Sequence, residues 1–293
     1  ATGGLGRLSA LLEDALVRTP EDEQDHLLGV AADVAVRRGD LMRARAYLDR
    51  MEAPDSTALA AVLRLEGRTD EADDLLMDAV HTTDSLRPRL ALITARIEDR
   101  VPGQHDDVAE VLDLLDALNP ATLPLEVRRT AVVAKALLRF SVLVVGGRLD
   151  EATELLADVS STGALPTKDV TDLRWRHAIA SDVLDAKLLA GLEQHLNGRD
   201  DLRANALRMS LLERMVTEGH DLALDMATEM RLSDAPSLSE RRLRARHATC
   251  LARLTTDPSR RAKLLHAAAM HRHAGSTRAA MALLDEAHTA RRG

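Results

Sequence analysis

Aromatic residues, cysteine and long apolar runs are scarce in this chain of 293 residues. It holds one tryptophan, one tyrosine and one phenylalanine: Trp175, Tyr47 and Phe140. Because single-stranded nucleic acids are bound largely by stacking on aromatic side chains, this scarcity argues against that class of binding. The lone cysteine, Cys250, excludes an internal disulfide and fits a reducing cytoplasm. No apolar run approaches the roughly 18 residues of a membrane span, so no membrane association is predicted.

The residues that are abundant favour helices. Ala, Leu, Arg and Glu are prominent, and all four have high helix propensity. No convincing alternating strand pattern is present, and the one strand-like run, Ser141 to Val145, ends a longer helical pattern. We therefore predict an all-α fold. The chain begins Ala-Thr-Gly-Gly without Met, which is compatible with a domain excised from a larger protein.

A phrase of helical spacing recurs along the chain, which is the signature of an internal repeat. It begins with glycine, carries alanine five residues later and leucine nine residues later. The four copies start at Gly39, Gly67, Gly147 and Gly275. Their alanines are Ala44, Ala72, Ala152 and Ala280, and their leucines are Leu48, Leu76, Leu156 and Leu284. Each copy predicts a tight turn followed by a helix with one buried face.

This phrase resembles the second helix of a tetratricopeptide (TPR) repeat, in which a small residue lets two helices cross closely. With weaker copies at Gly103 and Gly219, the intervals are 28, 36, 44, 72 and 56 residues, whereas the TPR period is about 34. The resemblance therefore implies degenerate repeats. It predicts a TPR-like α-solenoid of antiparallel helix pairs, with about sixteen helices.

We expect one domain over residues 1–293, because no connection is long enough to require a second. The most loop-like stretch is Ser160 to Pro166, and a bend is predicted near 160–167. Thr19-Pro20 reads as the start of a helix that runs to Arg38. Periodicity is nearly continuous from Lys168 to Leu196, where Asn197-Gly198 ends the helix.

The sequence offers little catalytic chemistry, so we predict no enzyme, no cofactor and no metal site. Gly3-Gly4-Leu5-Gly6 lacks the lysine and the preceding strand of a phosphate-binding loop. The histidines at 266, 271 and 273 have no carboxylate or cysteine at ligand spacing. His247 and Cys250 could meet on one helix, but a nucleophile pair also needs an orienting group and an oxyanion donor.

Two candidate binding regions remain. Trp175 is flanked by Arg174 and Arg176, so it could line a groove and anchor a ligand or partner, although a large apolar side chain also serves to fill a core. The second region is basic. Residues 236–293 carry 12 Lys and Arg against 4 Asp and Glu in a chain of net charge −8. The arginines that define this docking patch are Arg241, Arg242, Arg244 and Arg246.

The patch suits an acidic protein partner or a neighbouring domain of the same polypeptide, or it is simply a solvated helix surface. No helix-turn-helix pattern accompanies it, so direct binding to nucleic acid is not predicted.

The repeat phrases at Gly39, Gly67, Gly147 and Gly275 also make the chain resemble the TPR-like helical arms of large ATP-binding LuxR-type and maltose-activator-like bacterial transcription regulators. This resemblance implies a non-catalytic cytoplasmic arm that senses a small-molecule effector or a partner protein through the concave face of a solenoid. The alternative is a stand-alone scaffold that binds proteins only. The sequence names neither the ligand, the partner nor the oligomeric state.

Overall fold

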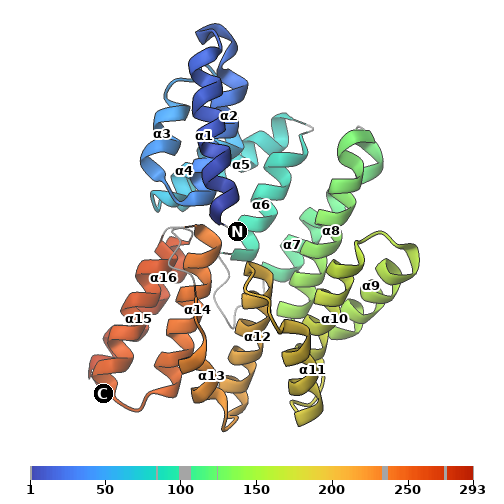
Figure 1. Cartoon of the computed structure of the whole chain (residues 1–293), viewed down its shortest axis with the longest axis vertical. Coiled ribbons are helices and arrows are strands. Elements are labelled where there is room, and N and C mark those ends of the chain that lie inside the picture. The colour runs from blue at the N-terminus through green and yellow to red at the C-terminus, as the bar shows by residue number, and fades with distance from the viewer. Residues whose placement is uncertain are drawn as a thin grey trace. The chain divides into compact units, whose positions relative to one another are not determined.

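The computed structural model describes residues 2–83, 85–98, 107–123, 125–232, 237–273 and 276–292. Over these residues the fold is all-α, as predicted: it has sixteen α-helices, two short 3₁₀ helices and no strand (Figure 1). The helices are α1 (Thr2–Arg18), α2 (Asp25–Arg38), α3 (Leu41–Leu48), α4 (Ser56–Leu65), α5 (Thr69–Thr82), α6 (Leu86–Glu98), α7 (Asp107–Ala117), α8 (Leu125–Val145), α9 (Leu149–Thr162), α10 (Thr167–Ser181), α11 (Ala186–Leu196), α12 (Leu202–Glu218), α13 (Ala223–Glu229), α14 (Leu238–Leu254), α15 (Pro258–His273) and α16 (Thr277–Arg292). The 3₁₀ helices are η1 (Glu21–Glu23) and η2 (Pro120–Thr122).

The chain forms two compact units. Unit 1 consists of Ala1–Leu92 and Arg231–Gly293, and unit 2 consists of Ile93–Met230. The prediction of one domain over residues 1–293 stays a prediction. Across the described residues, none of the helices combines the length and the apolar content that a bilayer crossing requires.

The glycines that open the repeat phrases end the preceding helix in a left-handed conformation. Gly39, Gly67 and Gly147 have φ values of 71°, 80° and 72°. In each case the next residue donates its N–H to a carbonyl five residues earlier, as Arg148 does to Leu143 at 2.9 Å. This is the Schellman arrangement, which satisfies carbonyls that the helix end leaves free. The weaker copy at Gly219 has the same geometry. Gly275, which opens the fourth copy, and Gly103, which opens the other weaker copy, lie outside the described residues.

The alanines of the phrase are buried where the helices cross. Ala44, Ala72 and Ala152 are fully buried, and Ala280 is 3% exposed. Ala44 of α3 lies in one apolar cluster with residues of α2 and α4, both of which pack against α3. The leucines divide: Leu48 and Leu76 are buried, whereas Leu156 and Leu284 are half-buried. The phrase therefore encodes helix packing.

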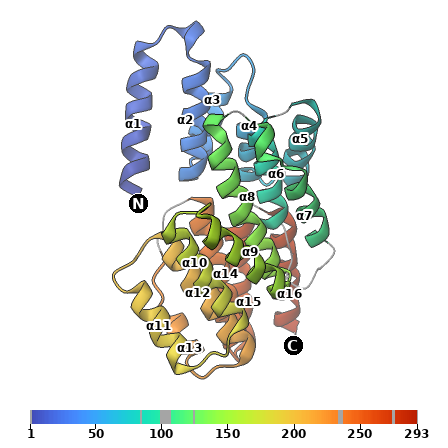
Figure 2. The same cartoon turned by 90° about the vertical axis from the view of Figure 1, so that its right-hand side faces the viewer.

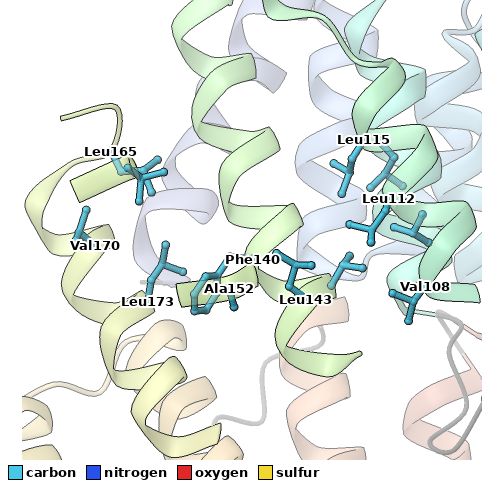
Figure 3. Packing of buried hydrophobic residues seen from close by; sticks show 13 residues of the cluster. Val108, Leu112, Leu115, Phe140, Leu143, Ala152, Leu165, Val170 and Leu173 are labelled. Atoms are coloured by element: carbon cyan, nitrogen blue, oxygen red, sulfur yellow. The ribbon is translucent and has the colours of Figure 1, made fainter. Parts of the chain in front are cut away.

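Unit 2 has its main core between α7, α8, α9 and α10. Figure 3 shows side chains from these four helices, among them Leu112, Phe140, Ala152 and Leu173, packed around a common interior. Phe140 is fully buried, so the single phenylalanine fills the core. Consecutive helices α8, α9 and α10 lie side by side, and α10 also packs against α8 and α12 (Figure 2). Helix α10 thus lies in the middle of this unit.

In unit 1 the final three helices pack consecutively, and α14 contacts α2. A second contact within this unit joins the His273 ring, at the end of α15, to Gly67 before α5. A Cβ atom placed on Gly67 would overlap Cε1 of His273. A side chain at this position would have to displace the His273 ring, in addition to adopting a backbone conformation that favours glycine.

Two predictions about helix boundaries are wrong: the helix start at Thr19 and the unbroken helix from Lys168 to Leu196. Side-chain hydrogen bonds explain both differences. Thr19 does not open a helix, because its hydroxyl donates to the carbonyl of Ala15 at the end of α1, and α2 begins only at Asp25. The predicted continuous helix from Lys168 to Leu196 is interrupted between Ser181 and Ala186. Asp185 accepts the backbone N–H of Leu188 at 2.8 Å and so starts α11 as a separate helix.

The predicted loop from Ser160 to Pro166 is shorter than expected, because α9 runs on to Thr162. Ser160, Ser161 and Thr162 donate their hydroxyls to carbonyls of the preceding turn, which holds these polar residues in the helix. The helix then ends at Gly163, which has a φ of 63°.

Candidate functional site

Trp175 lies near the middle of α10 and is half-buried against α11. Its indole ring stacks on the imidazole of His195, with ring centroids 5.8 Å apart and planes inclined by 27°. One turn earlier on α11, a Cβ atom on Gly191 would lie 2.9 Å from Cη2 of Trp175. Glycine therefore admits the edge of the indole at this crossing, while His195 supports its face. Both contacts restrict the rotamers of Trp175.

A buried ion-pair cluster surrounds His195. Asp172 precedes Trp175 by one helical turn, and its side chain is only 9% exposed. Its Oδ1 lies 3.0 Å from His195 Nε2 and accepts a hydrogen bond of 3.1 Å from Nη1 of Arg199. Burial alone would raise the pKa of Asp172, but hydrogen bonds from Arg199 and His195 outweigh it and hold the pKa below its usual value. Asp172 is therefore a carboxylate at neutral pH.

The cluster continues to the start of α12. Nε of Arg199 donates to Asp201 Oδ2 at 3.4 Å, and Asp201 caps α12 by accepting the N–H groups of Arg203 and Ala204 at 3.0 Å each. Arg203 also pairs with the buried Asp169 of α10. Ion pairs thus tie α10 to the end of α11 and to the start of α12, and Trp175 lies beside this framework.

The structure separates the three residues that the sequence groups together. Arg174 is exposed and donates to Ser160 Oγ on α9 at 3.4 Å, whereas Trp175 contacts α11. Consecutive residues project about 100° apart on a helix, so adjacency in sequence does not place them on one surface. Arg176 is half-buried. The binding role of all three residues stays a prediction.

The four arginines of the predicted docking patch lie on α14 and are half-buried. Burial, and then the positive charges of Arg244 and Arg241, lower the pKa of His271 on α15. These two arginines therefore lie near α15. Arg261 of α15 donates to the carbonyls of Ala252 and Thr255 at the end of α14. The docking role of Arg241, Arg242, Arg244 and Arg246 also stays a prediction.

Cys250 and His273 belong to unit 1, whereas the cluster around His195 belongs to unit 2. Among the described residues, no three His, Cys, Asp or Glu side chains gather closely enough to hold a metal ion. Cys250 is buried, 2% exposed. His273 lies against Gly67 in unit 1. None of these arrangements points to a reaction.

Sequence reasoning missed Asp172, His195 and Arg199, although their spacing was visible. Asp172 and Trp175 are three residues apart, and Gly191, His195 and Arg199 follow one another at intervals of four. Residues at these spacings share a helix face, as Asp172 and Trp175 do on α10 and Gly191 and His195 do on α11, whereas Arg199 lies beyond the end of α11. What the sequence lacked was the information that the two faces meet.

Comparison with family models, with curated proteins and with solved structures gives no match to this chain.

Proposed function

We propose that this chain is a non-catalytic helical-repeat binding domain whose contact surface centres on Trp175. In this proposal it is the sensing arm of a bacterial transcription regulator, as the repeat phrases at Gly39, Gly67 and Gly147 suggest. The observation that carries the proposal is the fixed, half-buried Trp175. Aromatic side chains held in one orientation lose little entropy on binding and are frequent anchors of protein and ligand contacts.

The packing of alternate helices supports a TPR-like solenoid. Helix α2 packs against α4, and α10 packs against both α8 and α12, in addition to the contacts between sequence neighbours. Contact between alternate helices is the pattern that helix pairs produce when they stack into a curved array. In such an array the first helices of successive pairs form the inner surface. Helix α10, which carries Trp175, would be one of these first helices.

The hydrogen bonds of the cluster suit positioning better than catalysis. The Asp172 carboxylate accepts from Arg199 and lies within hydrogen-bond distance of His195. These groups contact one another, and a general base must instead reach a substrate proton. The arrangement therefore favours a rigid support for the indole ring.

Native mass spectrometry of the freshly purified chain, run beside its denatured mass, tests the sensor reading. A sensor is expected to retain a small molecule of a few hundred daltons that is lost on denaturation. Trp175→Ala should reduce this retained mass by removing the anchor. Tyr47→Ala, which removes a half-buried aromatic residue of unit 1, serves as the matched control and should retain it.

The outcomes separate the alternatives. Equal retention in the wild type and in Trp175→Ala would show that the contact surface lies elsewhere. If no sample carries extra mass, the alternative function is favoured: a scaffold that binds proteins only.

A further inference from the structure

Three polar atoms of unit 2 lie within hydrogen-bond distance of one another. His195 Nε2 is 3.0 Å from Asp172 Oδ1 and 2.7 Å from Arg199 Nη1, and Arg199 Nη1 is 3.1 Å from Asp172 Oδ1. The side chains of His195 and Arg199 are 19% and 18% exposed. Both side chains are therefore largely shielded from water but keep some contact with it.

One imidazole nitrogen cannot satisfy both neighbours at once. A neutral ring with a lone pair on Nε2 accepts from Arg199, but then its lone pair faces the Asp172 carboxylate. A ring with a proton on Nε2 donates to Asp172, but that proton faces the N–H groups of Arg199. In the imidazolium form both nitrogens carry protons, so only the bond to Asp172 is available.

Arg199 has hydrogen-bond partners other than His195, so it can lose its contact with His195 and stay paired. Its Nε donates to Asp201 at 3.4 Å, and its Nη2 donates to Asp172 Oδ2 at 3.4 Å. Nearby, Arg203 is paired with Asp169.

Arg208 of α12 is a further cation beside His195. It donates to the carbonyl of Leu196, the residue that follows His195, at 3.1 Å. The indole of Trp175 covers one face of the imidazole. Protonation thus redistributes hydrogen bonds among groups that are already in place.

We propose that the His195–Asp172–Arg199 triangle is a proton-dependent positioning device for Trp175. When His195 takes up a proton from solvent, its Nε2 can only donate, so its contact with Arg199 is lost and its hydrogen bond with Asp172 is the one that remains. The imidazolium then lies over the indole face, where a cation–π attraction adds to the stacking. Trp175 is held more firmly in the protonated state. The consequence, a pH-dependent binding surface, rests on the proposed function, whereas the switch in Trp175 packing does not.

The intrinsic fluorescence of the chain tests this directly, since Trp175 is its one tryptophan. A protonated imidazole quenches indole emission more strongly than a neutral one. We expect emission to fall along a single curve as the pH is lowered and the imidazole becomes protonated. His195→Gln should abolish the curve. His177→Gln is the matched control, because His177 is two residues from Trp175 but bonds Thr153 of α9, and it should keep the curve.

A second variant keeps the test valid if His195→Gln fails to give a native far-UV circular dichroism spectrum. Asp172→Asn removes the negative charge that stabilises the imidazolium, so its titration midpoint should move to lower pH. A wild type without a titration curve, or an unchanged curve in His195→Gln or in Asp172→Asn, overturns the proposal. The titration uses no ligand, so its failure is distinct from a failure of the proposed binding function, which native mass spectrometry reports separately.

Discussion

Two copies of the repeat phrase, at Gly67 in unit 1 and at Gly147 in unit 2, share one backbone and differ in their neighbours. Both glycines have positive φ, and both are followed by an arginine that pairs with a glutamate in the first turn of the next helix. Both alanines are fully buried. These shared residues build the hairpin between two helices.

The residue six positions after the glycine is where the copies diverge. In unit 1 it is Asp73, which pairs with the buried Arg64 of the preceding helix. In unit 2 it is Thr153, whose Oγ1 lies 2.8 Å from Nε2 of His177 on the following helix, α10. In unit 1 this ion pair joins the two helices of one hairpin, whereas in unit 2 the contact reaches the next helix along the chain, which carries Trp175. The glycine, arginine and alanine that the two copies share thus build the same hairpin, while the residue six positions after the glycine makes a different contact in each copy.

The largest effect is expected from the Arg64–Asp73 pair. Removing one partner leaves the other charge in a poorly solvated place, so Arg64→Met should cost about 3 kcal/mol of unfolding free energy. Thr153→Val removes one exposed hydrogen bond and should cost about 0.5 kcal/mol. Urea unfolding followed by circular dichroism measures both. Equal shifts for the two variants would contradict the distinction between the copies.

A smaller effect is expected from the two glycines. Alanine at Gly147 meets open space, so Gly147→Ala should cost only the left-handed backbone penalty of about 1–2 kcal/mol. Gly67→Ala also meets His273 and should cost more. Adding His273→Ala should bring Gly67→Ala to the level of Gly147→Ala, as measured by urea midpoints. If the difference persists in the double variant, the His273 contact is not its cause.

A pH-dependent effect is expected from the Asp172 carboxylate of unit 2. Its pKa is lower in the folded state than its usual value of 3.8, so its contribution to stability is fully present above that value. The contribution is lost as the pH falls through the folded-state pKa. The gap in urea midpoint between wild type and Asp172→Asn should therefore be widest near neutral pH and shrink below about pH 4. Asp225→Asn, on the exposed side of α13, should show no comparable gap, and a pH-independent gap for Asp172→Asn would argue against an ion-pair role.

Local signals made most of the fold predictable. The run Ser141 to Val145 ends a helix as predicted, since α8 spans Leu125–Val145, and the tight turns predicted at Gly39, Gly67 and Gly147 are present with left-handed backbone. The break before α11 was not anticipated, because it depends on Asp185 capping a new helix within an otherwise helical pattern. Thr19 was misread because its hydroxyl, which could cap a following helix, instead bonds the carbonyl of Ala15 at the end of α1.

The site was only partly predictable. Trp175 stood out by its rarity, but Arg174 and Arg176 were grouped with it by adjacency alone. Its partners His195 and Gly191 come from another helix, and their contact depends on how α10 and α11 cross. No sequence pattern within one helix predicts how α10 and α11 cross.

The nanosecond fluorescence anisotropy decay of Trp175 tests the central claim, that this side chain is fixed by its neighbours, most directly. In the wild type at neutral pH we expect the decay to follow the tumbling of the protein, with little fast local motion of the indole. In His195→Ala, which removes the stacked ring, a fast component should appear. A large fast component in the wild type, or an unchanged decay in the variant, would contradict a pre-positioned Trp175.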